Sequence, residues 1–186
     1  MMTIFSHLSR RLFAVGCVAL FGLGAGIGTA VAAEPDFRFP SIDGGEIDLG
    51  AWRGSPVLVV NTASLCGYVG QFDDLQALQD RYGAAGLKVL AVPSDDFAQE
   101  LADAGAVKSF CDANFDLTLP MTDIQHVKGP EAHPFYLWVA DQTGFVPGWN
   151  FNKVLLDADG QVVDTWGAGT SPLSAVMIGR IEALLP

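Results

Sequence analysis

Two cysteines with different surroundings are the residues best suited to chemistry in this sequence. Cys66 follows a run of β-branched residues and lies a few positions before a helical pattern that begins near Gly70. The N–H groups at a helix start favour a nearby anion, and the thiolate is the reactive form of cysteine. The segment Cys66-Gly67-Tyr68-Val69 lacks the second cysteine of a Cys-x-x-Cys pair. We therefore predict that Cys66 is reactive, but not through local dithiol exchange.

Cys111, the second cysteine of this part of the chain, lies in a segment with helical spacing. If the chain is exported to an oxidising compartment, a structural disulfide between Cys66 and Cys111 is the plainest expectation. A thiol that condenses with an oxidised Cys66 fits the same sequence, and so does an inert thiol on a buried helix face. The positions of the cysteines do not decide between these three interpretations.

Residues 1–33 have the composition of a targeting segment. They contain no Asp or Glu, their only Lys or Arg residues are Arg10 and Arg11, and an apolar run follows over 12–27. The small residues at the end of the segment predict a signal peptide that is cleaved after Ala32 or Ala33. The paired arginines resemble a twin-arginine export signal. We therefore expect one domain over 34–186 in the periplasm or secreted, with an uncleaved anchor as the alternative.

The charge of the chain limits its partners. The 186 residues include 10 Lys and Arg against 21 Asp and Glu, which gives a net charge of -11. Such a surface repels phosphate backbones, so we predict no nucleic-acid partner. His126 and His133 have no cysteine or acid at metal-ligand spacing, and no glycine-rich phosphate loop is present. We expect neither a metal nor a cofactor.

Alternating strand and helix patterns predict the scaffold that positions Cys66. A hairpin is expected around Asp43-Gly44-Gly45, and the uninterrupted apolar runs 56–63 and 87–92 predict strands buried on both faces. Apolar spacings of three and four predict helices over 70–82 and 104–115. The remaining expected elements are a helix over 132–140, strands over 153–157 and 161–166, and a final helix over 172–185 that Pro172 opens. This order predicts an α/β fold with a mixed central sheet and helices on both faces.

Several segments together resemble the glutathione peroxidase family. The resemblance rests mainly on two segments. Residues 61–68 read Asn-Thr-Ala-Ser-Leu-Cys-Gly-Tyr, and residues 149–153 read Trp-Asn-Phe-Asn-Lys. Supporting segments follow in the family's order at 92–97, 99–100, 110–111 and 127–134. The resemblance covers nearly all of 34–186 and implies a thioredoxin-like fold. It further implies a peroxidatic Cys66 surrounded by Gln99, Trp149 and Asn150, with Cys111 as the resolving thiol.

One loop departs from the family pattern. Family members usually have two small residues between Phe and Gln-Glu, whereas this chain has only Ala98 between Phe97 and Gln99. Either the shortened loop takes another route that brings Gln99 to the thiol, or the site lacks one hydrogen-bond donor.

The resemblance implies a thiol peroxidase that reduces hydrogen peroxide and organic or lipid hydroperoxides. Amide and indole N–H groups would donate where negative charge develops as the O–O bond breaks. The chain lacks the longer insertion that many tetrameric members carry before Trp149, which resembles the short monomeric members. No Lys or Arg cluster suited to glutathione is visible, so a thioredoxin-like reductant is expected. A redox sensor or a non-catalytic binding protein that keeps the fold is the alternative.

Overall fold

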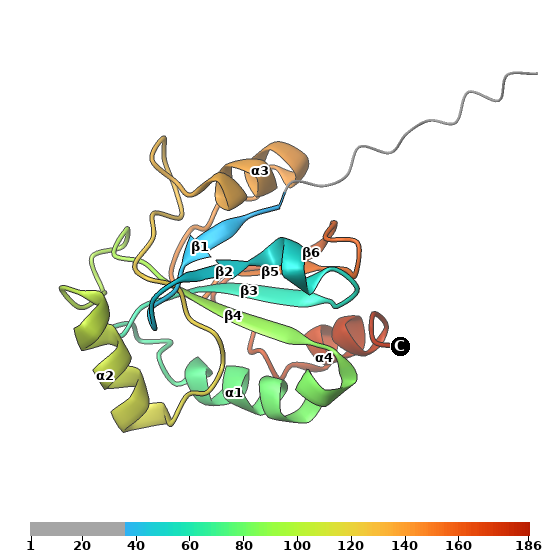
Figure 1. The fold of residues 1–186 in the computed structure, drawn as a ribbon, viewed down its shortest axis with the longest axis horizontal. Helices are drawn as coiled ribbons and strands as arrows, with labels where there is room; N and C mark the ends of the chain where they lie inside the picture. Colours follow the sequence, from blue (N-terminus) through green and yellow to red (C-terminus); the bar gives the residue numbers. More distant parts are fainter. Residues whose placement is uncertain (1–35) are drawn as a thin grey trace, which may run out of the picture. The chain divides into compact units, whose positions relative to one another are not determined.

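The computed structural model describes residues 36–186, and a four-stranded sheet lies at its centre (Figure 1). The strand order is β4-β3-β5-β6. Strand β3 (Val57–Thr62) runs parallel to β4 (Lys88–Pro93) and antiparallel to β5 (Lys153–Leu156), which is antiparallel to β6 (Val162–Trp166). The predicted mixed sheet is therefore confirmed.

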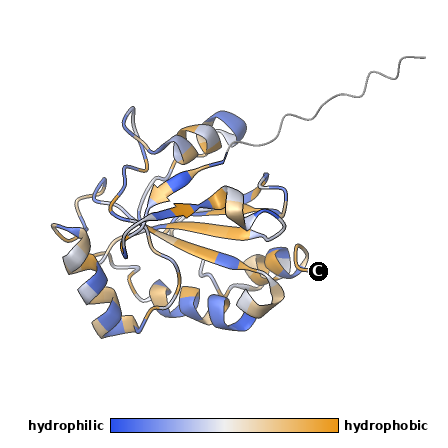
Figure 2. Cartoon of the chain, viewed as in Figure 1, coloured by the Kyte–Doolittle hydropathy of each residue, from blue (hydrophilic) through white to orange (hydrophobic). Residues whose placement is uncertain are grey.

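Helices cover both faces of this sheet. Helices α1 (Gln71–Tyr82) and α4 (Ala175–Glu182) lie on one face, and α3 (Pro134–Thr143) lies on the other (Figure 1). All six residues of β3 are buried, and the central strands are the most apolar part of the ribbon (Figure 2). Two apolar clusters fill the two layers, since a strand covered on both faces has to present apolar side chains to each.

The remaining elements flank the sheet. Helix α2 (Ala104–Phe115) has the predicted bounds, and its N-cap Asp103 accepts a hydrogen bond from the N–H of Ala106. The short 3-10 helix η2 (Gly83–Ala85) follows α1. The final helix begins at Ala175, so the prediction that Pro172 opens it was wrong. Ser171 forms a turn there instead, because its carbonyl and hydroxyl oxygens accept from the N–H groups of Ser174 and Leu173.

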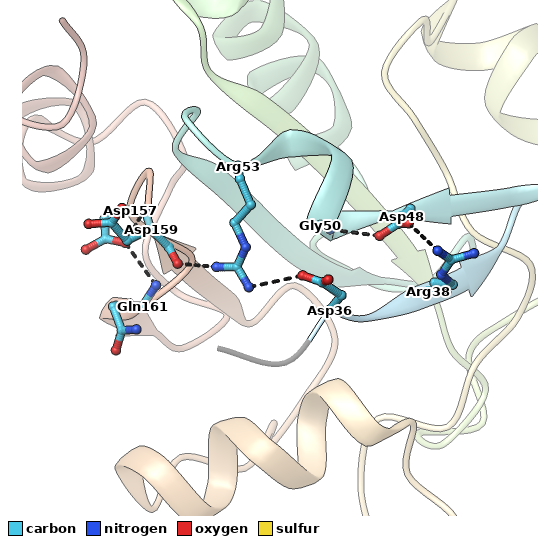
Figure 3. Close-up of polar contacts among 8 residues, drawn as sticks. All are labelled: Asp36, Arg38, Asp48, Gly50, Arg53, Asp157, Asp159 and Gln161. Atoms are coloured by element: carbon cyan, nitrogen blue, oxygen red, sulfur yellow. Dashed lines mark hydrogen bonds and ion pairs between the residues drawn. The ribbon is translucent and has the colours of Figure 1, made fainter. Parts of the chain in front are cut away.

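The predicted hairpin forms a separate two-stranded sheet from β1 (Arg38–Pro40) and β2 (Glu46–Asp48), which leads into the 3-10 helix η1 (Leu49–Trp52). Arg53 follows η1 and ties this segment to the turn between β5 and β6 (Figure 3). Its guanidinium donates to the carbonyl of Asp159 and lies 3.4 Å from the carboxylate of Asp36. Gly160, at a φ of 79°, leaves no room for a Cβ beside Arg53. The hairpin end of the chain is thereby fixed to the sheet.

The predicted signal peptide over 1–33 lies outside the described residues. Within 36–186, no helix has the length and hydropathy that a membrane crossing requires.

Candidate active site

Cys66 lies in the turn between the carboxyl end of β3 and the start of α1. The N–H of Tyr68 donates to Cys66 Sγ at 3.4 Å, and the N–H of Val69 donates to the Cys66 carbonyl at 3.0 Å. The residue is only 3% exposed, although Leu65 and Tyr68 beside it are 59% and 41% exposed. The sulfur therefore lies just beneath the surface, with a backbone donor directed at it.

The shortened loop keeps Gln99 beside the cysteine segment. The N–H of Leu65 donates to the Gln99 carbonyl at 2.9 Å, and Asn150 Nδ2 donates to Gln99 Oε1 at 3.1 Å. Ala98 has a φ of 55°, in the left-handed region that residues with a Cβ seldom adopt. Its N–H closes a tight turn onto the carbonyl of Asp95 at 2.8 Å. A left-handed turn at Ala98 thus makes up for the residue that the loop lacks.

Glu100 fastens the same loop and has no role in the sequence prediction. Its Oε1 accepts hydrogen bonds from the N–H groups of Ser64 at 3.0 Å and Leu101 at 2.8 Å. Burial raises the pKa of this carboxyl group, against the lowering effect of its hydrogen bonds. The only sequence signal for Glu100 is its place after Gln99 in the family's Gln-Glu pair. It joins the Gln99 loop to the residues just before Cys66.

Trp149 and Asn150 are held by the central strand. Asn61 of β3 donates through Nδ2 to the Trp149 carbonyl at 3.0 Å and accepts through Oδ1 from the Asn152 N–H at 3.0 Å. Asn150 is fully buried, whereas Trp149 is 41% exposed and packs against Phe97 with ring centroids 5.4 Å apart. The indole of Trp149 is therefore partly exposed at the surface and is not a core side chain.

This arrangement leaves two hydrogen-bond donors available. Asn150 Nδ2 donates to Gln99 Oε1, which turns the Gln99 amide so that its own NH₂ group is free to donate elsewhere. Within the described chain, neither Gln99 Nε2 nor Trp149 Nε1 has a hydrogen-bond partner. Both are uncharged, so both can donate to a neutral ligand as well as to an anion.

Cys111 is a buried thiol on α2. Both cysteines of the described chain are free thiols, and they belong to the same apolar cluster. Burial raises the pKa of Cys111 to about 12, and the carboxylates of Glu100 and Asp112 act in the same direction. Cys111 is 2% exposed. Burial therefore disfavours the reactive thiolate, so a resolving role would require Cys111 to become exposed.

Helix α2 is weakly anchored. Val107 and Cys111 are its only buried residues, and the cavity of about 130 Å³ that Cys111 lines is also lined by acidic and basic side chains. Lys108 Nζ lies 2.9 Å from the carboxylate of Asp43 in the β1–β2 turn and 3.5 Å from that of Asp112. Apart from these residues, α2 is held by the partly buried Phe110 and Phe115, which pack against the apolar cluster, and by the ion pair of Lys108 with the β1–β2 turn.

A buried lysine next to the site was not predicted to be functional. Lys153 is 0% exposed, and its Nζ donates to Gln71 Oε1 at 2.6 Å and to the Thr170 carbonyl at 2.6 Å. Gln71 is the first residue of α1. Burial lowers the pKa of Lys153 to about 8, although the carboxylate of Asp74 opposes this shift. Lys153 joins the start of α1 to the loop before α4, and its place in an apolar strand pattern hid it in the sequence.

His126 and His133 each form side-chain hydrogen bonds within the protein. His126 Nδ1 lies 2.7 Å from Asp96 Oδ1, and His133 Nδ1 accepts from the Phe135 N–H at the start of α3. Residues 36–186 contain no group of three His, Cys, Asp or Glu side chains that could hold a metal ion.

Comparison with known proteins points to one family. The family model described as glutathione peroxidase matches residues 36–140. A glutathione peroxidase of Lactococcus lactis is 36% identical over 142 residues, covering 74% of this chain and 90% of the relative. The hydroperoxy fatty acid reductase gpx1 of Synechocystis is 35% identical over 150 residues, covering 73% and 87%. The solved structure of T. cruzi GPX1 aligns with a TM-score of 0.61 at 27% identity, over 80% of this chain and 93% of that one.

Proposed function

We propose, because the chain belongs to the glutathione peroxidase family, that this peroxidase uses Cys66 to reduce hydrogen peroxide and organic or lipid hydroperoxides. The observation that carries the proposal is the hydrogen bond between Asn150 and Gln99 beside the Cys66 segment. Among the relatives, one is named a hydroperoxy fatty acid reductase and another a probable phospholipid hydroperoxide glutathione peroxidase. These names support a substrate range that extends to acyl hydroperoxides.

In the first step, the thiolate of Cys66 attacks the terminal oxygen of the peroxide. An S–O bond forms, the O–O bond breaks, and the departing alkoxide takes a proton to become an alcohol. Cys66 is left as a sulfenic acid. The N–H groups of Gln99 and Trp149 donate to the departing oxygen, while Asn150 orients Gln99 for this purpose.

In the second step, the thiol of Cys111 attacks the sulfenic sulfur of Cys66. A disulfide forms, and the sulfenic oxygen leaves as water with the proton of Cys111. The two sulfurs must come within bonding distance, and Cys111 is only 2% exposed on α2, so we propose that α2 unwinds around Cys111. Val107 and Cys111 are the buried residues of α2, and the small number of such residues keeps this opening local.

A dithiol of the thioredoxin class then reduces the Cys66–Cys111 disulfide and is itself oxidised. Trp149 and Tyr68 are exposed, and Lys128 lies over the Phe97 ring that packs against Trp149. The sequence shows no cluster of Lys or Arg residues suited to the two carboxylates of glutathione, which favours a protein reductant. We further propose that the enzyme acts as a monomer in the periplasm or outside the cell.

The decisive experiment is mass spectrometry of the reduced protein before and after one equivalent of hydroperoxide, with free thiols alkylated. A Cys66–Cys111 disulfide that forms within the mixing time and disappears on adding thioredoxin and its reductase supports the cycle. A stable sulfenic acid or a mixed disulfide with one partner would favour the redox sensor. Two unreacted thiols would refute the peroxidase mechanism.

The Cys66→Ser variant controls for this experiment. Removing the attacking thiolate should abolish peroxide consumption, since Cys111 is a protonated, buried thiol. Residual consumption near the wild-type rate would remove Cys66 from the mechanism.

A further inference from the structure

One cation lies against the aromatic side chains of the site. Lys128 Nζ is 4.0 Å from the centroid of the Phe97 ring, and the Phe97 and Trp149 centroids are 5.4 Å apart. The ammonium, the phenyl ring and the indole therefore form a continuous row, which ends at a residue whose indole N–H is available to a peroxide. Phe97 is also two positions from Gln99.

Among the described residues, 36–186, the ammonium of Lys128 has no carboxylate partner. Of the cationic side chains in residues 36–186, Lys128 and Lys88 alone make neither an ion pair nor a hydrogen bond, and Lys128 is exposed. A cation at a ring face is attracted by the ring electrons but keeps its N–H groups free for an anion.

The acids near Lys128 are occupied elsewhere or too distant to pair with it. Asp96 accepts from His126 Nδ1 and from the N–H groups of Val127 and Lys128 at 2.7, 2.6 and 3.1 Å. The Asp95 side chain accepts from the N–H of Glu100 at 3.0 Å. Glu131 is exposed and forms no ion pair with Lys128. The side-chain ammonium is thus held over Phe97 by the backbone contact with Asp96, without being neutralised by it.

The cysteine segment also carries exposed apolar side chains. Leu65, Tyr68 and Trp149 are 59%, 41% and 41% exposed, and Leu65 and Tyr68 flank Cys66. Large apolar side chains this exposed around a reactive residue suit a ligand with an apolar body. A ligand that covers the row would place an anionic group at Lys128 and an apolar chain over the rings.

We propose that Lys128 is a specificity residue for amphipathic hydroperoxides that carry a carboxylate, such as fatty-acid hydroperoxides. Its ammonium binds the carboxylate, the acyl chain lies over Phe97 and Trp149, and the hydroperoxide group reaches Cys66. This inference rests on the proposed peroxidase function. On a protein whose net charge of -11 repels anions, a single unpaired cation beside the site decides whether an anionic substrate is accepted.

The test compares Lys128→Gln with Lys88→Gln, using linoleic acid hydroperoxide, its methyl ester and tert-butyl hydroperoxide below micellar concentrations. Lys88 is a matched control, since it is unpaired and lies at the opposite end of β4 from the site loop. Glutamine keeps much of the side chain on the Phe97 ring while removing the charge. Equal melting temperatures of the two variants verify that the fold is retained.

We expect Lys128→Gln to raise the KM for the free acid roughly 3- to 10-fold, with the kinetics of the ester and of tert-butyl hydroperoxide unchanged. Added salt should shrink the wild-type preference for the acid over the ester. An equal loss for acid and ester, or no change for either, would overturn the role of Lys128. A wild-type protein that reduces none of the three would instead refute the proposed function itself.

Discussion

The amide nitrogen of Asn150 donates to Oε1 of Gln99 at 3.1 Å, and this hydrogen bond decides which end of the Gln99 amide can face a substrate. Asn150 is fully buried and its Oδ1 has no partner within the described chain, so the residue serves Gln99 and not bulk water. A buried amide oxygen without a partner is costly. The pair is therefore one unit, in which Asn150 is the positioning residue.

This relationship predicts coupled effects of the two side chains. Gln99→Ala removes one donor to the departing oxygen and should slow sulfenic acid formation by about 10²-fold. Asn150→Ala leaves Gln99 free to rotate and should slow the same step. If the two act as a unit, the double variant is no slower than the worse single variant. Stopped-flow tryptophan fluorescence during a single turnover measures this step. Gln161→Ala, in the β5–β6 turn, is the control, and independent multiplicative effects would contradict the coupling.

A second prediction separates attack from resolution. Cys111→Ser should consume one equivalent of peroxide at the wild-type rate and then stop, because no thiol can displace the sulfenic oxygen from Cys66. Trapping with dimedone should find the sulfenic acid on Cys66. Turnover supported by thioredoxin should be lost. Full thioredoxin-dependent activity in this variant would mean that the reductant resolves Cys66 directly.

A third prediction concerns the ion pair between Lys108 and Asp43, which are 2.9 Å apart. The pair joins α2 to the β1–β2 turn, so breaking it should ease the unwinding that Cys111 needs. Asp43→Asn should speed disulfide formation after sulfenic acid formation by about 2- to 5-fold, as expected for an exposed pair. Rapid acid quenching followed by mass spectrometry gives the rate. Glu46→Gln, which breaks the hairpin's own pair with Arg38, is the control and should leave it unchanged.

A fourth prediction follows from burial of Lys153, which lowers its pKa to about 8 from an unfolded value of about 10.4. At pH values between these two pKa values, Lys153 is protonated in the unfolded chain and has released its proton in the folded chain. The contribution of Lys153 to the free energy of unfolding therefore rises with pH across this window and is lost as pH falls through 8.

Cys111 acts in the opposite sense, since burial raises its pKa to about 12 and its contribution falls as pH rises above the unfolded value. The measurement is therefore the difference in unfolding free energy between wild type and Lys153→Met from pH 7 to 10.5, in which the Cys111 effect cancels. A difference that does not vary with pH would show that Lys153 is ionised normally in the folded protein.

Local sequence patterns predicted much of this architecture. The run at Val57–Thr62 predicted a central strand because apolar side chains on both faces leave no solvent-facing side, and the spacing of apolar residues placed α2 without error. Pro172 misled the prediction, since proline suits a helix start and also the turn that Ser171 completes. The Ser171 hydroxyl also donates to the carboxylate of Asp74 on α1, and this contact between distant segments could not be predicted from the local pattern.

The sequence named candidate site residues but not the contacts that join their segments. Cys66, Gln99, Trp149 and Asn150 were identified from segments in family order, and the structure brings these segments together. The left-handed turn at Ala98 could not be foreseen, because alanine gives no sign of a positive φ. The burial of Lys153 was missed for a related reason: a lysine within a strand is usually turned to water, and its neutral partners lie far away in the sequence, at the start of α1 and in the loop before α4.

The turn at Ala98 also bears on whether the segment Asp95–Glu100 can be moved to another protein. Asp95 closes the segment twice, by accepting from the N–H of Ala98 through its carbonyl and from the N–H of Glu100 through its side chain. Its ends are tied to the cysteine segment, since Gln99 accepts from the Leu65 N–H and Glu100 from the Ser64 N–H, so a graft onto another thioredoxin-fold scaffold would have to include that partner segment. Glycine or asparagine at position 98 would suit such grafts, whereas valine or isoleucine would unfold the turn and withdraw the amide.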